Sequence, residues 1–139
     1  MSSLTRFGMS LDSTLLDRFD QLISRTGPKN RSEAIRDLIR DALVRHDWEQ
    51  EKGEKVGTIT LIYDHHAGDI SERMTELEHR HHQLVISKMH IHLDHDNCLE
   101  VLAVRGEAAE IHKIANELIG MKGVKHGKLV ATTSGKNLK

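Results

Sequence analysis

Cysteine, aromatic side chains and long apolar runs are all scarce in this sequence of 139 residues. The single cysteine, Cys98, excludes an intrachain disulfide, so its thiol is a small core residue, a nucleophile or a metal ligand. No apolar run approaches the roughly 20 residues of a membrane helix. The N-terminus lacks the apolar core of a signal peptide. We therefore expect a cytoplasmic protein that makes no use of a membrane.

Aromatic residues make up only 3% of the chain, against 37% hydrophobic residues in all. Any core must therefore be built from aliphatic side chains and methionine. A small domain with so few large side chains is only marginally stable by itself. The composition therefore favours an oligomer.

Histidine, in contrast, is abundant, with eleven in the chain. Eight of them fall within one segment of the sequence: His65, His66, His79, His81, His82, His90, His92 and His95. Charge is less informative, because the net value is −1 and residues 1–46 carry eight basic and six acidic residues. Such a small basic excess does not by itself identify a nucleic-acid partner.

The first 46 residues predict a strand followed by two helices. Residues 5–11 alternate apolar and polar side chains as a half-buried strand does. Asp12 or Ser13 can cap a first helix that ends at Gly27-Pro28, and Asn30 can cap a second. A lone strand cannot satisfy its own backbone groups, so we expect it to pair with a second copy as a two-stranded ribbon. Such a ribbon fits the DNA major groove and would display the polar side of the strand, Arg6, Gly8 and Ser10.

The remainder predicts a second domain of class α+β. Strands are expected at 57–63, 84–93, 98–105 and 124–132, with helices at 68–82 and 107–120. This βαββαβ order is typical of a ferredoxin-like fold, whose helix-free face commonly packs against another subunit. We expect a DNA-binding domain at 1–47, a linker at 48–55, a metal-binding and assembly domain at 56–133 and a disordered tail at 134–139.

A metal site is expected on the hairpin around residues 94–97. His90 and His92 lie two residues apart on one strand, so both imidazoles project from the same face. Cys98 begins the partner strand just across the turn. Imidazoles with one thiolate suit zinc, copper or nickel better than magnesium or calcium. A further ligand can come from the preceding helix, which carries His79, His81 and His82.

Other interpretations of these residues remain open. The two histidines can be exposed strand residues and Cys98 a core thiol. A small metal hydrolase could use the open coordination position, with Glu100 or Asp94 as its general base, although the N-terminal domain would then have no role. A ribbon-helix-helix repressor with incidental histidines would bind DNA regardless of metal.

Two motifs together resemble a known family over nearly the whole chain. Residues 30–36 (Asn-Arg-Ser-Glu-Ala-Ile-Arg), behind the alternating strand, resemble the ribbon-helix-helix signature. With the spacing His90-x-His92-x5-Cys98, the chain resembles the NikR family of nickel-responsive regulators. The resemblance implies a dimeric ribbon-helix-helix domain joined to a ferredoxin-like domain of the ACT type.

The resemblance also implies a regulatory function and its metal ligands. His90, His92 and Cys98 match three ligands of a square-planar nickel site, and His79 matches a fourth that a neighbouring subunit donates. Glu100 matches an acidic residue beside the ligands. The implied protein is a homotetramer, a dimer of dimers with one Ni(II) per subunit, which binds palindromic operator DNA and represses nickel-uptake genes. The helix period also allows His82 to take the place of His79, whereas His81 lies off that face.

For DNA, the resemblance assigns base reading to Arg6, Gly8 and Ser10. Asn30, Arg31 and Ser32 begin a helix whose amides can hold phosphate. Glu33 and Asp37 match carboxylates that hold a second, hard cation such as K⁺ in the DNA complex. Two departures bear on DNA contacts: Gly8 replaces a hydrogen-bonding side chain of the ribbon, and Ala67-Gly68 replaces a basic pair that touches the DNA backbone.

Overall fold

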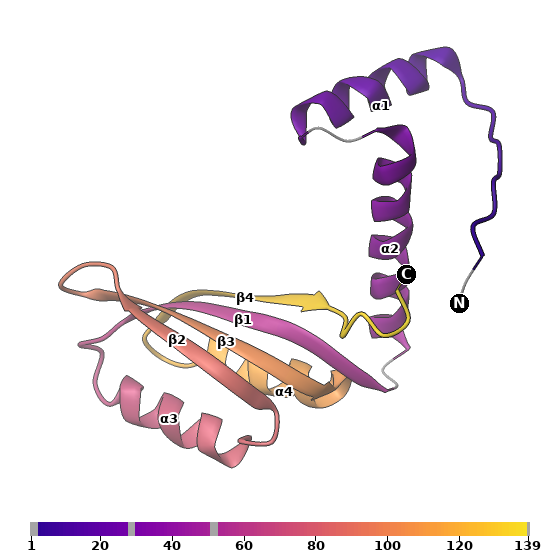
Figure 1. Cartoon of the computed structure of the whole chain (residues 1–139). Helices are drawn as coiled ribbons and strands as arrows, with labels where there is room; N and C mark the ends of the chain where they lie inside the picture. The colour runs from indigo at the N-terminus through magenta and orange to yellow at the C-terminus, as the bar shows by residue number, and fades with distance from the viewer. Residues whose placement is uncertain (1–2, 28–29, 51–52, 139) are drawn as a thin grey trace. The chain divides into compact units, whose positions relative to one another are not determined.

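The computed structural model describes residues 3–27, 30–50 and 53–138, and the chain divides into the compact units Met1–Asp41 and Ala42–Lys139. The first unit holds α1 (Ser13–Arg25) and the start of α2 (Arg31–Glu49), as Figure 1 shows. The predicted caps are confirmed, because Asp12 accepts hydrogen bonds from the amides of Thr14 and Leu15, and Asn30 accepts one from Glu33. Helix α1 is followed by Thr26 as its C-cap, and Pro28, part of the predicted stop, lies outside the described residues.

The predicted strand at 5–11 has no regular secondary structure in this single chain. A strand needs a neighbour for its ladder, and pairing with a second copy therefore stays a prediction. The apolar side chains that would face such a copy are exposed, with Phe7 at 70% and Met9 at 58%. Leu15, Leu22 and Leu38 on the two helices are more than half exposed as well. One copy of this unit thus leaves its apolar side uncovered.

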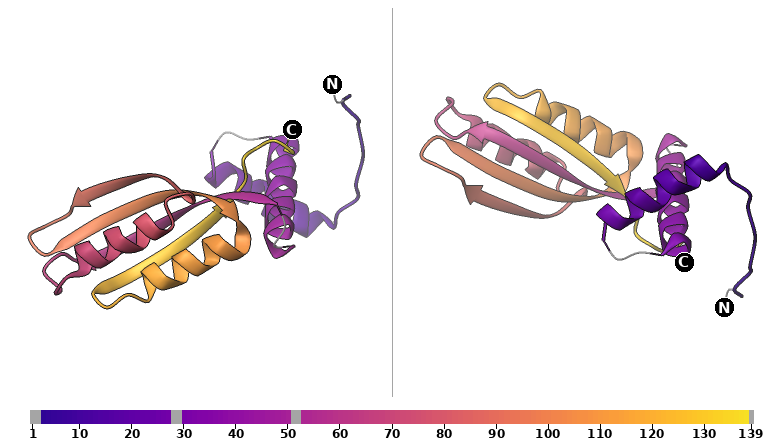
Figure 2. Two further views of the ribbon diagram at one scale, coloured as in Figure 1. Left: turned by 90° about the horizontal axis from the view of Figure 1, so that it is seen from below. Right: turned by 90° about the horizontal axis from the view of Figure 1, so that it is seen from above.

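The second unit has the predicted βαββαβ order. It consists of β1 (Glu54–Asp64), α3 (Ile70–Arg80), β2 (Val85–His92), β3 (Asn97–Glu107), α4 (Ala108–Ile119) and β4 (Val124–Thr132). The four strands form one sheet in the order β2-β3-β1-β4, with every neighbouring pair antiparallel. Both helices lie on the same side of this sheet (Figure 2). The α+β class and the ferredoxin-like topology are confirmed.

Alternation along the strands divides the sheet into two faces. Ile59 and Leu61 of β1 are fully buried on the helix side, where they belong to one core with Ile111, Ile114 and Leu118 of α4. The opposite face carries every second residue of the same strands. There Met89 of β2 and Val130 of β4 are about half exposed. The helix-free face is therefore apolar and open in the single chain.

The boundary between the predicted domains differs from the expected linker at 48–55. Helix α2 continues to Glu49 and β1 already begins at Glu54, while residues 51–52 lie outside the description. Helix α2 extends this far because Trp48 anchors its end. The Trp48 ring is buried in the core of the second unit, and its indole N–H donates to the Thr132 carbonyl (2.7 Å).

The expected disordered tail at 134–139 is described up to residue 138. There the Leu138 amide donates to the Gly135 carbonyl (3.2 Å). Within the described ranges, no helix is both long enough and apolar enough to cross a membrane.

Candidate metal centre

The β2–β3 hairpin brings His92 and Cys98 together. The two residues are paired in the antiparallel register, and Cys98 Sγ lies 3.5 Å from His92 Nδ1. The turn between the strands is fixed by Asp94, whose Oδ1 accepts from the amides of Asp96 (2.9 Å) and Asn97 (2.8 Å). The predicted turn thus places an imidazole beside the thiol.

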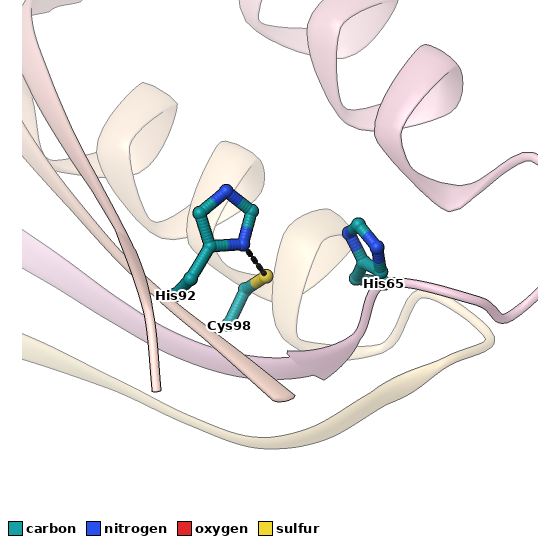
Figure 3. A group of neighbouring side chains, drawn as sticks. All are labelled: His65, His92 and Cys98. Carbon is teal, nitrogen blue, oxygen red and sulfur yellow. Dashed lines mark hydrogen bonds between the residues drawn. The ribbon is translucent and has the colours of Figure 1, made fainter. Parts of the chain in front are cut away.

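A third possible ligand, His65, was not predicted as part of this site. It follows β1, whose Tyr63 is the register partner of Cys98, and its amide donates to the Asp96 carbonyl (2.9 Å). One donor atom each from His65, His92 and Cys98 lie within 4.8 Å of one another. Figure 3 shows Cys98 between His92, from the end of β2, and His65, from the turn after β1. The histidine-rich sequence was a signal, but the pairing of β1 with β3 is needed to select His65.

His90 lies on the same face of β2, with its ring centroid 4.9 Å from that of His92. Its Nδ1 is 3.1 Å from the Tyr63 hydroxyl oxygen. Burial, together with the negative charge of Glu100, raises the pKa of Tyr63 to about 12. The tyrosine therefore stays a neutral hydroxyl, and its hydrogen bond orients the His90 ring, as groups behind a metal-binding histidine do.

His79 does not join these residues in the single chain. It lies near the end of α3, with its ring 6.3 Å from that of His82, whose Nδ1 contacts the His79 carbonyl (3.2 Å). Neither of these histidines, nor His81, belongs to a group of metal-binding donors among the described residues. Donation of His79 by a neighbouring subunit therefore stays a prediction.

The electrostatics of Cys98 suit a site that binds a cation. The residue is 1% exposed, and burial raises the pKa of its thiol, with further contributions from Glu100, Asp94 and Asp64. The thiol is thus protonated without a metal. The same carboxylates attract a cation, and coordination favours the thiolate. Imidazole nitrogens with one thiolate are a donor set for nickel, zinc or copper, so these residues fit the predicted metal.

Beside the candidate metal ligands, Lys88 joins two buried carboxylates. Its Nζ lies 2.9 Å from Glu78 Oε2 on α3 and 3.2 Å from Glu100 Oε1 on β3. Glu78 and Glu100 are 8% and 2% exposed, and Glu78 Oε1 has no hydrogen-bond partner among the described residues. Burial raises the pKa of Glu78. This cluster of one cation and two carboxylates fixes α3 to the sheet next to His90, the register partner of Glu100.

Two substitutions in this cluster should change stability in opposite directions. Lys88→Met leaves two buried carboxylates without a cation. It should lower the free energy of unfolding of the metal-free protein by about 1–3 kcal/mol. This loss is smaller than for a fully buried ion pair, because Lys88 is partly exposed and solvent screens its charge. Glu78→Gln removes a carboxylate whose ionisation is disfavoured in the folded state, and should stabilise the protein at neutral pH.

The gain from Glu78→Gln should disappear at acidic pH. Because the pKa of Glu78 is raised above its ordinary 4.5, its ionisation penalises the folded state above that value and not below it. Urea unfolding of both variants at neutral and acidic pH checks this. Equal destabilisation by both would show that the cluster acts only through its hydrogen bonds.

The predicted DNA-binding residues occupy the first unit. Arg6, Gly8 and Ser10 lie in the exposed segment before α1. Arg31 makes a two-pronged contact with Asp20 of α1 (2.9 and 2.7 Å), which joins the two helices. Next to it, Asn30 caps α2.

The other predicted residues of this unit lie on α2. Ser32 and Glu33 are exposed in its first turn. Asp37 Oδ1 lies 3.4 Å from Arg40 Nη1. No metal-binding group of three donors includes Glu33 or Asp37 among the described residues, so the second cation stays a prediction.

Comparisons with known proteins agree with both units. Residues 56–132 match the family described as NikR C terminal nickel binding domain, and residues 5–46 match ribbon-helix-helix protein, copG family. A relative from Geobacter sulfurreducens is 61% identical over 138 residues, covering 99% of each chain, and one from Solibacter usitatus is 54% identical over the full length of both. Both are described as nickel-responsive regulators.

A similar fold over part of the chain also occurs outside these relatives. An uncharacterized protein from Thermotoga maritima is similar with a TM-score of 0.52 at 14% identity, over 57% of this chain and 98% of its own. At that identity the likeness shows the fold alone. The family matches and the full-length relatives, in contrast, establish the family of the chain. The chain belongs to the NikR family of nickel-responsive regulators, which are not enzymes, and joins a ribbon-helix-helix region to a nickel-binding domain.

Proposed function

We propose that this protein is a nickel-dependent transcriptional repressor that controls nickel-uptake genes from the cytoplasm. The observation that supports it best is that His92 and Cys98 face each other on one hairpin, with His65 from the loop after β1 beside them, in a domain that matches the nickel-binding family. One Ni(II) per subunit would be held by His90, His92 and Cys98, with His79 from a neighbouring subunit. When bound, nickel would link these side chains across the two subunits.

Other side chains of the protein position these ligands and set the charge around them. Tyr63 orients His90, and Glu100 places negative charge beside both the thiol and Lys88. Because His79 lies on α3 and the other ligands on the hairpin, a site shared between subunits would couple metal binding to assembly. We propose a homotetramer, a dimer of dimers, joined through the second unit.

DNA binding is assigned to the first unit. Two copies would pair their N-terminal segments as a ribbon that places Arg6, Gly8 and Ser10 in the major groove of a palindromic operator. The start of α2, at Asn30, Arg31 and Ser32, would hold phosphate. For Arg31 this requires exchange of its contact with Asp20. Glu33 and Asp37 would hold a second, hard cation such as K⁺ in the DNA complex.

Nickel and operator DNA should each tighten the binding of the other. If nickel favours the DNA-competent arrangement of the tetramer, thermodynamic linkage requires the reciprocal effect by the same factor, typically 5- to 150-fold. Operator fragments can be selected from genomic DNA with the nickel-loaded protein, and binding measured by fluorescence anisotropy with and without Ni(II). DNA affinity that does not depend on nickel would instead support a metal-independent ribbon-helix-helix repressor.

A further inference from the structure

A second group of metal-binding side chains lies at the same end of the sheet, outside the proposed nickel centre. It consists of His66 from the loop after β1, and His95 and Asp96 from the β2–β3 turn. One donor atom from each lies within 4.8 Å of the other two. His66 Nε2 is 3.6 Å from Asp96 Oδ1 and 3.0 Å from the His95 carbonyl oxygen. All three side chains are exposed, so a cation can reach them from solvent.

The backbone holds these three donors in place. The His65 amide donates to the Asp96 carbonyl (2.9 Å), which joins the loop to the turn. The His66 amide donates to Asp64 Oδ1 (2.9 Å), and the Asp94 carboxylate fixes the turn from within. Donors held in position before binding lose less conformational entropy when the ligand arrives.

We propose that His66, His95 and Asp96 form a second binding site for a divalent transition-metal ion. Two imidazoles and one carboxylate are a donor set for ions such as Co²⁺, Ni²⁺ and Zn²⁺, and they leave coordination positions for water. His66 Nε2 would exchange its contact with the His95 carbonyl for the metal. The site lacks a thiolate and is exposed, so it binds more weakly and exchanges faster than the centre at Cys98. A bound ion would link the loop that carries His65 to the turn that precedes Cys98.

An ion pair between a protonated His66 and Asp96 would give similar geometry without a metal, so the test must count ions. Equilibrium dialysis of the full-length metal-free protein against Co(II) measures the number bound. Absorption reports separately on the thiolate, through charge-transfer bands that only Cys98 can produce. We expect two ions per wild-type chain. In His66→Ala and in Asp96→Ala the weaker ion should bind at least about tenfold less tightly, with the thiolate bands unchanged.

The matched control is His126→Ala, which removes an exposed strand histidine that belongs to neither group. It should retain both ions. Equal binding by His66→Ala, Asp96→Ala and His126→Ala would overturn the proposal, as would a single ion in the wild type that carries the thiolate bands. If the proposed nickel centre fails instead, the result is different. The wild type would then show no thiolate bands, but it would still bind an ion whose affinity falls in His66→Ala.

Discussion

Cys98→Ala is expected to remove the charge-transfer absorption of the nickel-loaded protein and to weaken nickel binding at least about a hundredfold. Loss of a group that merely supports a metal ligand typically costs 10- to 100-fold, and Cys98 is the only thiolate available. The imidazoles that remain bind nickel without the soft, anionic donor. A Ni(II) titration followed by absorption and calorimetry measures both effects.

The interpretation of this variant depends on its fold. Cys98 is buried, so the metal-free Cys98→Ala protein should be compared with wild type by thermal unfolding and circular dichroism. His65→Ala and His79→Ala then separate the two histidines that compete for the remaining position. If His79 is the ligand from a neighbouring subunit, only its loss should also weaken assembly with nickel. Charge-transfer bands that persist in Cys98→Ala would contradict the proposed centre.

Met89→Asp is expected to reduce the proposed tetramer to a dimer. Met89 lies on the helix-free face of the sheet and is about half exposed. Ile91 on the same strand shares this face, and so does Val130 on β4 at the opposite edge of the sheet. In a symmetric interface one substitution appears in both partners, so each contact would acquire two buried carboxylates that repel each other. The N-terminal units should still pair, because their apolar side is unchanged. Light scattering coupled to size-exclusion chromatography measures the mass.

Lys113→Asp is the matched control for assembly. It places the same carboxylate on the exposed side of α4, which lies on the other side of the sheet. It should leave the mass at four copies. If both variants have the wild-type mass, the open sheet face does not join the subunits, and the proposed tetramer would have to use another surface.

Local pattern was sufficient for most elements of the second unit. The last strand was predicted at its observed bounds, 124–132. Helix α4 was predicted within one residue at each end, because its apolar residues recur with the period of a helix. The start of β1 was missed because Glu54 and Lys55 are charged, and the end of α2 because residues 47–50 show no periodicity. There Trp48 decides the structure through burial against residues far away in the sequence.

Only the part of the metal centre that lies on one hairpin could be predicted from the sequence. A turn of four residues determines that His92 faces Cys98, so this contact could be inferred from spacing. The proximity of His65 depends on how β1 pairs with β3, and the contact of Lys88 with Glu78 depends on how α3 packs on the sheet. Neither the register between distant strands nor the packing of a helix on the sheet can be recognised from a local sequence pattern. The same limit applies to His79, whose proposed role depends on another chain.

The burial of Trp48 affects how the nickel-binding part can be studied alone. A truncated protein beginning at residue 56, where the family match starts, would lack this indole and its hydrogen bond to the end of β4. It would also lack the first two residues of β1, which pair with the end of β3. An excised fragment should therefore begin near residue 42, so that it keeps the last turns of α2 as part of its own core.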